Sequence, residues 1–164
     1  MRYGNGRIVV GLDGTPGGRA ALAFALHDAA RRGAAVEVIT AFDTAETLAT
    51  LCGTSARSIG IATEELRDAI QKEAAGIVEE LSAELASTWE RVPPVTVTAV
   101  VGGATHALLH AALGADLLVV GSRGRGGFAS TVLGSVSMQC VLYASCPVTV
   151  VHPSAAQAVV SVPA

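Results

Sequence analysis

Residues 117–135 read LLVVGSRGRGGFASTVLGS, an apolar run followed by a glycine-rich stretch. The run Leu117–Val120 has the composition of a strand that is buried on both faces of a parallel sheet. The segment from Ser135 to Cys146 and Pro147 predicts a helix whose first turn is capped by the Ser135 hydroxyl. A strand, a glycine-rich turn and a helix in this order are typical of an anion-binding loop in an α/β protein.

The strand pattern recurs along the chain, in short runs rich in Val, Ile and Thr that helical segments separate. The other runs are Ile8–Val10, Val36–Phe42, Val95–Val101 and Val148–Val151. This alternation predicts an α/β fold with a parallel sheet. The first and fourth runs are continuously apolar, which favours the centre of the sheet, whereas the third and fifth alternate, which favours its edges. The turns GLDGT (11–15) and GSRGRGG (121–127) are then predicted to meet where the strand order reverses.

The helical segments carry start and stop signals. Thr15 is a predicted N-cap, Pro16 occupies the first helical position, and Gly33 lies just past the end. A second helix is predicted from Thr63 onward, with apolar residues at the 3.6-residue period and two glutamates in its first turn. A third is predicted over about Thr105–Leu113.

Composition excludes several classes of function. The net charge is −3, with eleven Lys and Arg residues spread along 164 positions, so no nucleic-acid partner is expected. The longest apolar run, Ala20–Leu26, is too short to cross a bilayer, so we expect a cytoplasmic protein without a membrane partner. The three cysteines lack a CxxC spacing, so no thiolate metal site is expected. We expect one domain over residues 1–153 and a flexible tail over 154–164.

The glycine-rich stretch is predicted to bind phosphate through main-chain N–H groups, which can replace a lysine. Gly121 would admit a ribose or phosphate without a Cβ clash, Gly124 is predicted to adopt a positive φ, and Gly134 would open the following helix. A Walker loop is excluded because the only lysine is Lys72, inside the second helix. The alternative is that these glycines only turn the chain.

The sequence resembles the universal stress protein family, in particular its members with the motif GxxGx9G followed by Ser or Thr. Gly121, Gly124, Gly134 and Ser135 match that motif, and the resemblance runs from Ile8 to His152. It implies an adenine nucleotide alpha hydrolase-like fold: an open, doubly wound, five-stranded parallel sheet in the order 3-2-1-4-5 with helices on both faces. This agrees with the strand positions predicted from composition.

The resemblance also implies a ligand and a set of contacts. Members with the motif bind ATP, with Mg or Mn bridging the phosphates as an option, and some related proteins favour cyclic AMP, so AMP or cyclic AMP is the alternative ligand. The implied nucleotide-binding residues in this chain are Gly11, Leu12, Asp13, Ala41, Val120, Gly121, Arg123, Gly124, Arg125, Gly134, Ser135, Val136 and Ser137.

Within this set, roles differ. Ala41 would contact the base, and Asp13 would accept hydrogen bonds from the ribose hydroxyls, with an Asx turn or a helix cap as the alternative. Ser135 would contact phosphate or only cap its helix, and Arg123 and Arg125 would neutralise phosphate charge or simply be solvated. No catalytic residue and no metal ligand is expected among these residues.

Three functions remain open after this reading. The first is a nucleotide-binding stress-response regulator that needs no turnover. The second is slow, divalent-dependent ATP hydrolysis. The third is a dimerisation module that works without nucleotide. Family members pair through the last strand, which here implies a homodimer through Val148, Thr149, Val150 and Val151.

Overall fold

The computed structural model describes residues 6–43, 56–88, 91–124 and 133–153, and for residues 56–62 only the course of the backbone. Strands and helices alternate along the chain, as the sequence pattern predicts. The elements in chain order are β1 (Arg7–Gly11), α1 (Pro16–Arg32), β2 (Ala35–Phe42), α3 (Ala56–Ala86), β3 (Val95–Val101), α4 (Ala104–Ala111), β4 (Leu117–Gly121), α5 (Ser135–Tyr143) and β5 (Val148–Val151).

The five strands form one parallel sheet in the order β3-β2-β1-β4-β5. This confirms the predicted fold, with the continuously apolar strands β1 and β4 in the centre and the alternating strands β3 and β5 at the edges. The order reverses between β1 and β4, so the turns that follow them begin side by side at the carboxyl edge of the sheet.

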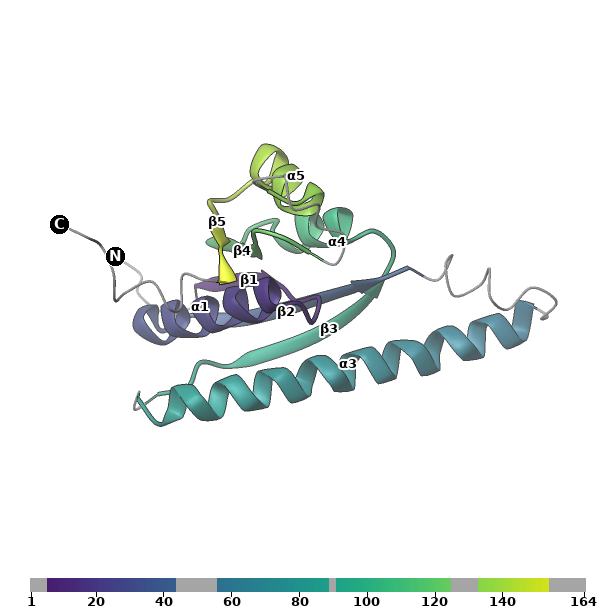
Figure 1. Ribbon diagram of the computed structural model, residues 1–164, viewed down its shortest axis with the longest axis horizontal. Helices are drawn as coiled ribbons and strands as arrows, with labels where there is room; N and C mark the ends of the chain where they lie inside the picture. Colours follow the sequence, from purple (N-terminus) through teal and green to yellow (C-terminus); the bar gives the residue numbers. More distant parts are fainter. Residues whose placement is uncertain (1–5, 44–55, 89–90, 125–132, 154–164) are drawn as a thin grey trace.

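Helices cover both faces of the sheet: α1 and α3 lie on one face, and α4 and α5 on the other (Figure 1). Successive side chains of a strand point to opposite faces, so β1 supplies both layers. Ile8 and Val10 pack in the cluster under α1 and α3, and Val9 packs in the cluster under α4. All three are at most 1% exposed, which explains why β1 shows no polar alternation.

Helix α1 follows its predicted signals. The Thr15 side chain accepts a hydrogen bond from the Gly18 N–H, Pro16 is the first helical residue, and Gly33 closes the helix in the left-handed conformation with φ of 68°. The Gly33 N–H donates to the Ala29 carbonyl, which satisfies one of the helix's last acceptors.

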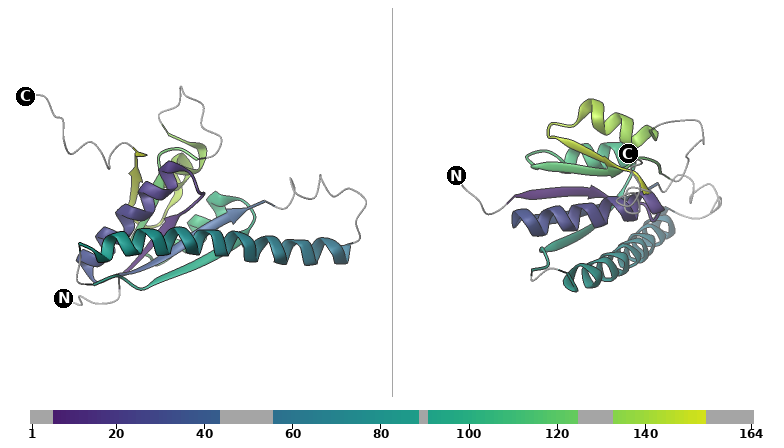
Figure 2. Two further views of the ribbon diagram at one scale, coloured as in Figure 1. Left: turned by 60° about the horizontal axis from the view of Figure 1, so that its bottom comes forward. Right: turned by 60° about the vertical axis from the view of Figure 1, so that its left-hand side comes forward.

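Helix α3 begins earlier than predicted. It starts at Ala56 rather than Thr63, so Glu64 and Glu65 lie beyond its first turn. Its N-terminal part extends past the carboxyl edge of the sheet (Figures 1 and 2). The sheet does not extend under that part of the helix. Apolar residues at the helical period are needed only where a helix packs on the sheet, so this pattern begins later in the sequence than the helix does.

Helix α5 also differs from the prediction at its first residue. Gly134 is the N-cap, with no side-chain hydrogen bond, and Ser135 is already the first helical residue. The predicted cap by the Ser135 hydroxyl is therefore wrong, because an N-cap side chain must precede the helical residues to reach their N–H groups.

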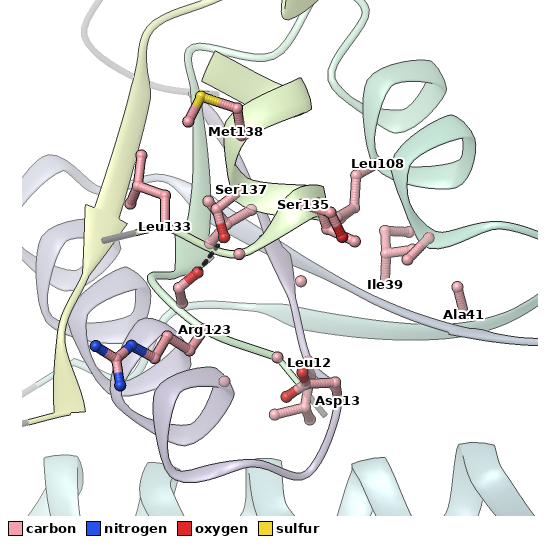
Figure 3. A pocket seen from close by; sticks show the side chains of 18 residues that line it. Leu12, Asp13, Ile39, Ala41, Leu108, Arg123, Leu133, Ser135, Ser137 and Met138 are labelled. Atoms are coloured by element: carbon pink, nitrogen blue, oxygen red, sulfur yellow. Dashed lines mark hydrogen bonds between the residues drawn. The ribbon is translucent and has the colours of Figure 1, made fainter. Parts of the chain in front are cut away.

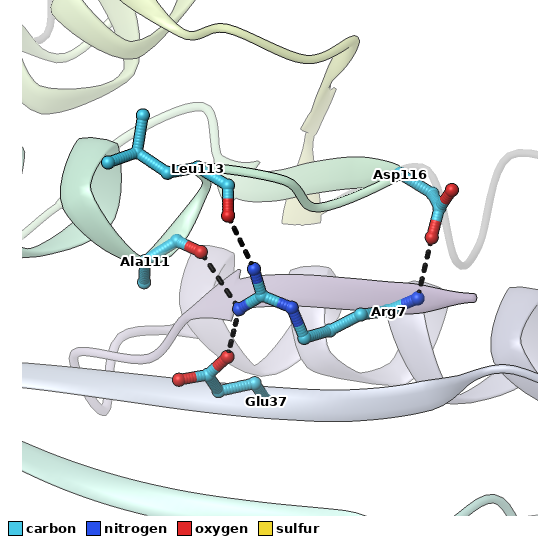
Figure 4. Close-up of polar contacts among 5 residues, drawn as sticks. All are labelled: Arg7, Glu37, Ala111, Leu113 and Asp116. Carbon is cyan, nitrogen blue, oxygen red and sulfur yellow. Dashed lines mark hydrogen bonds and ion pairs between the residues drawn. The ribbon is translucent and has the colours of Figure 1, made fainter. Parts of the chain in front are cut away.

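Arg7 links several elements at the amino edge of the sheet, opposite the edge where the turns after β1 and β4 begin (Figure 4). Its guanidinium forms an ion pair with Glu37 on β2 and donates to the carbonyls of Ala111 and Leu113 at the end of α4, at 2.9 and 2.7 Å. Its backbone N–H donates to the Asp116 carboxylate at 2.7 Å. One side chain therefore joins β1, β2 and α4 and satisfies two carbonyls at a helix end.

Within the described segments, no helix has both the length and the apolar composition needed to span a lipid bilayer.

Candidate functional site

A cavity of about 620 Å³ opens at the carboxyl ends of β1, β2 and β4, between the starts of α1, α4 and α5. Its volume is typical of a small-molecule site. The cavity brings together every predicted site residue that the structure describes, whereas Arg125 lies outside the described residues. Those on its lining are Gly11, Leu12, Asp13, Ala41, Val120, Gly121, Arg123, Gly124, Gly134, Ser135, Val136 and Ser137.

The lining also contains residues that were not predicted from the sequence. Ile39, Leu108, Leu133 and Met138 also face the cavity (Figure 3). Ile39 could have been found, because it lies two residues before Ala41 and residues at that spacing share a face of a strand. Leu108 had no such signal, since only the packing of α4 against the end of β2 brings it there.

The cavity has an apolar end and a polar end. Leu12, Ile39, Ala41 and Leu108 line the region near β1, β2 and α4 (Figure 3). The turn after β4 and the start of α5 form the other end, where main-chain N–H groups are present beside the apolar side chains of Leu133, Val136 and Met138. An elongated ligand with a flat apolar group at one end and an anionic group at the other matches this division.

The polar end is the N-terminus of α5. The first N–H groups of a helix have no partner inside it. The Gly134 N–H donates to the Ser122 carbonyl at 2.8 Å. Helix geometry leaves the next three N–H groups, of Ser135, Val136 and Ser137, without intrahelical acceptors, and all three residues line the cavity. With the positive end of the helix dipole, they form a site that favours an anion.

Ser137 fixes α5 against the end of β4. Its hydroxyl donates to the Gly121 carbonyl at 2.6 Å, and the side chain is 4% exposed (Figure 3). Ser122, the residue after Gly121, has a buried hydroxyl without a hydrogen-bond partner among the described residues. Its N–H donates to the Val151 carbonyl on β5 at 2.8 Å. The Ser137 hydroxyl is thus used within the protein, and the residue's N–H is the group that remains for a ligand.

Asp13 adopts the predicted Asx turn. Its Oδ1 accepts hydrogen bonds from the N–H and the hydroxyl of Thr15, at 3.0 and 2.5 Å. The residue is partly exposed and lines the cavity. The Asx turn, which the sequence offered as the alternative to the ribose contact, is therefore present, and the ribose contact stays a prediction.

At Gly121 the protein's own backbone occupies the space that a side chain would need. A Cβ at Gly121 would lie 2.6 Å from the carbonyl carbon of Gly17 and 3.0 Å from the Gly18 nitrogen. Gly17 is packed in the same way, since its Cβ would lie 2.8 Å from the Arg123 carbonyl oxygen. These glycines allow the start of α1 to touch the chain that leaves β4, which sets one wall of the cavity.

Gly124 does not have the predicted positive φ. The described glycines with positive φ are Gly14, Gly33, Gly102 and Gly114. The constraint at Gly124 is instead a neighbour, because its Cβ would lie 3.1 Å from Oδ2 of Asp13. The prediction of a positive φ at Gly124 is therefore wrong. The structure indicates instead that a glycine at this position leaves room for the Asp13 carboxylate.

The exposed Arg123 side chain points away from Asp13 and Ser135 (Figure 3).

On the buried side of α5, burial raises the pKa of the Cys140 thiol from 9.0 to about 11, so this thiol stays protonated near neutral pH. Among the described residues, no group of three or more His, Cys, Asp or Glu side chains is placed to hold a metal ion.

The sequence profile of the universal stress protein family matches residues 4–152. The chain belongs to the universal stress protein family. A relative from Mycobacterium tuberculosis, also a universal stress protein, is 36% identical over 151 residues, which are 90% of this chain and 45% of the relative. The chain thus spans about half the length of the curated relatives that it matches.

Solved universal stress proteins share the fold. The protein UspA from Lactobacillus plantarum has a TM-score of 0.70 at 23% identity, covering 92% of this chain and 99% of its own. A universal stress protein solved in complex with cAMP has a TM-score of 0.61 at 26% identity, covering 91% and 98%. The expected fold, an open five-stranded parallel sheet in the order 3-2-1-4-5 with helices on both faces, is confirmed.

Proposed function

We propose that this universal stress protein binds an adenine nucleotide, with ATP as its ligand, and acts in the stress response by nucleotide-dependent sensing or sequestration. The observation that carries the proposal is the division of the cavity into an apolar end and a helix N-terminus that supplies main-chain donors. The cAMP complex of a family member supports an adenine nucleotide as the class of ligand.

In this proposal the base lies against Leu12 and Ala41, and the ribose lies near Asp13. The phosphates approach the N–H groups of Ser135, Val136 and Ser137. The bound ligand would therefore extend from the apolar end of the cavity, past the turn after β1, to the first turn of α5. When present, a bridging Mg²⁺ or Mn²⁺ would neutralise part of the triphosphate charge.

The first experiment identifies the ligand. Nucleotide released by heat denaturation of the purified protein is separated by chromatography, and calorimetry then measures the affinity of nucleotide-free protein for ATP, AMP and cyclic AMP. We expect ATP near one equivalent per chain. Release of cyclic AMP or AMP, with weaker binding of ATP, would replace ATP by that ligand, and binding of none of them would refute the proposal.

A pair of substitutions at Ser135 tests the main-chain donors directly. Ser135→Pro removes one N–H from the first helical position, where proline fits, and the extended Gly134 (φ −70°, ψ 160°) is compatible with a following proline. Ser135→Ala is the matched control, because it keeps the N–H and removes the hydroxyl. Loss of a hydrogen bond to a charged group predicts about tenfold or more weaker ATP binding for proline. Equal affinities of the two variants would contradict the assignment.

Slow hydrolysis is the second candidate. Among the described residues that line the cavity, the ionisable side chains are Asp13 and Arg123, so the lining lacks a histidine, glutamate or lysine that could serve as a general base. We therefore propose binding without efficient turnover. An assay of phosphate release with Mg²⁺, Mn²⁺ or EDTA decides between the two, since sustained metal-dependent release over many turnovers would establish an enzyme.

We further propose that two copies pair through β5, which lies at the edge of the sheet. Beside it, α5 exposes Met138, Val141, Leu142 and Tyr143 by 45–70%. An apolar helix face next to an open strand edge favours association. Light scattering should show a dimer for the wild type and a monomer for Leu142→Glu, with Phe24→Glu on α1 as the control. A dimer in both variants would place the interface elsewhere.

The third candidate, a dimerisation module that works without nucleotide, is separated by combining these measurements. A dimer that forms equally well with and without bound nucleotide, in a protein that releases no nucleotide on denaturation, would favour it. The cytoplasmic location stays a prediction from the sequence.

A further inference from the structure

Two histidines lie one turn apart on the outer face of α4. His106 and His110 are both exposed, whereas Ala107 and Leu108 of the same helix are buried in the cluster against the sheet. Residues four apart on a helix are neighbours on its surface, so the two histidine side chains share one face. They belong neither to the core nor to the lining of the cavity.

The two imidazole rings are stacked. Their centroids lie 6.5 Å apart, and their planes are inclined by 19°. A metal ion bound to one nitrogen of each ring, at about 2.0–2.1 Å and with an N–metal–N angle of about 90–110°, places the centroids roughly 4.5–5 Å apart. Each ring would have to tilt and move by roughly 1 Å or less to hold such an ion. Exposed side chains can make this movement by rotation about their χ angles while the helix backbone stays fixed.

The chemistry of the pair favours a transition-metal ion over Mg²⁺ or Ca²⁺. Neutral imidazole is a good ligand for Zn²⁺, Ni²⁺ and Cu²⁺, whereas Mg²⁺ and Ca²⁺ take oxygen ligands. Two histidines at positions i and i+4 are also the spacing with which a helix binds zinc. Among the described residues, no third His, Cys, Asp or Glu side chain completes a metal site, so water would supply the remaining ligands.

We propose that His106 and His110 form a surface site that binds one divalent transition-metal ion, with affinity rising from Co²⁺ to Ni²⁺ to Cu²⁺. The site is separate from the cavity and does not rest on the proposed function. The bound ion would link the first and last turns of α4, a helix of eight residues. It would stabilise the folded state, because the helix is what makes the two rings neighbours.

Calorimetric titration with Ni²⁺ tests the site on nucleotide-free protein, as the full chain without a histidine tag. We expect one equivalent of Ni²⁺ per chain. Two linked ligands bind about a hundredfold or more tightly than one, so His106→Gln and His110→Gln should each weaken Ni²⁺ binding by about that factor. His27→Gln, which removes an exposed histidine of α1, is the matched control and should bind Ni²⁺ as the wild type does.

Thermal denaturation gives a second measurement. At a Ni²⁺ concentration one hundred times the wild-type Kd, the wild type should melt about 5–10 °C higher than without metal. At the same concentration, each single variant should shift by about 2 °C or less, because its site would be only half occupied. Glutamine is a good helix former, so both variants should fold and melt within about 2 °C of the wild type when no metal is present.

Each outcome decides the inference. If either single variant binds Ni²⁺ as tightly as the wild type, the two rings do not act as a pair and the inference is overturned. An equal loss of affinity in His27→Gln would place the ion elsewhere and would also overturn it. Absence of this site would leave the proposed nucleotide binding intact, and failure to bind ATP would leave the metal site intact.

Discussion

Replacing Gly121 by alanine is expected to destabilise the fold itself, because the added methyl group has no space. Its carbon would lie 2.6 Å from the Gly17 carbonyl carbon, 2.8 Å from the Gly17 oxygen and 3.0 Å from the Gly18 nitrogen. All three atoms belong to the backbone of the first turn of α1, so no side chain can rotate away to relieve the contact.

The size of the effect follows from the overlap. Ordinary van der Waals contact begins at 3.4 Å, so the start of α1 must withdraw from β4 by about 0.8 Å. Overpacking of this kind costs roughly 1–3 kcal/mol, and a domain of this size loses about 2–4 °C in melting temperature for each kcal/mol. We therefore expect Gly121→Ala to melt roughly 2–12 °C below the wild type.

Gly76→Ala is the matched control for this experiment. Gly76 lies on an exposed position of α3, and a Cβ there would meet no atom within 4 Å. Alanine is the better helix former by about 1 kcal/mol, so this variant should melt slightly above the wild type. Thermal denaturation followed by circular dichroism at 222 nm, a wavelength that reports helix, compares the three proteins. A Gly121→Ala protein as stable as the wild type would refute the claim that this glycine is required for packing.

Three further predictions concern other parts of the molecule. Gly124→Ala should leave the melting temperature within about 2 °C of the wild type but weaken ATP binding in calorimetry, because among the described residues its methyl group meets the Asp13 carboxylate alone. Arg7→Met should cost about 1–2 kcal/mol in urea denaturation, since two carbonyls at the end of α4 lose their donor. Burial raises the pKa of Cys140 to about 11, so the unfolded chain ionises first as pH rises from 9.0. The free energy of unfolding should therefore fall by about 1.4 kcal/mol per pH unit more in the wild type than in Cys140→Ala over that range.

The sheet was predictable because burial on one or both faces leaves a direct trace in composition. Ile8–Val10 and Leu117–Val120 read as continuously apolar and are central, whereas Val95–Val101 alternates and lies at an edge. The signals at the ends of α1 were equally local, since capping by Thr15 depends on residues within one turn. The early start of α3 at Ala56 left no such trace, because that part of the helix extends past the sheet.

The candidate site was predictable as a set of residues but not in its internal roles. Sequence alone cannot say whether a missing side chain makes room for a ligand or for the protein's own backbone. At Gly121 the neighbour is the start of α1, and at Gly124 it is the Asp13 carboxylate. Both depend on how α1 packs against the end of β4, a contact between segments about a hundred residues apart in the chain. The contribution of Leu108 depends on a similar contact of α4.

The two ends of the cavity belong to different layers of the fold, so the proposed ligand would contact both layers. Asp13 packs against Gly18 of α1 on one face of the sheet, and the N–H groups of Ser135 and Ser137 belong to α5 on the other. Binding would stabilise the folded protein by about 2.7 kcal/mol at a ligand concentration one hundred times Kd, and contacts with both layers would spread the protection over both.

Hydrogen exchange should then slow on ATP binding in both helices, α1 and α5, while the amide protons of the edge strand β3 change little. A ligand held only by the N-terminus of α5 would protect α5 alone. Protection confined to α5 would therefore contradict the contact with Asp13 even if ATP binds tightly. Protection of both helices in the wild type, restricted to α5 in Asp13→Asn, would assign the coupling of the layers to that single carboxylate.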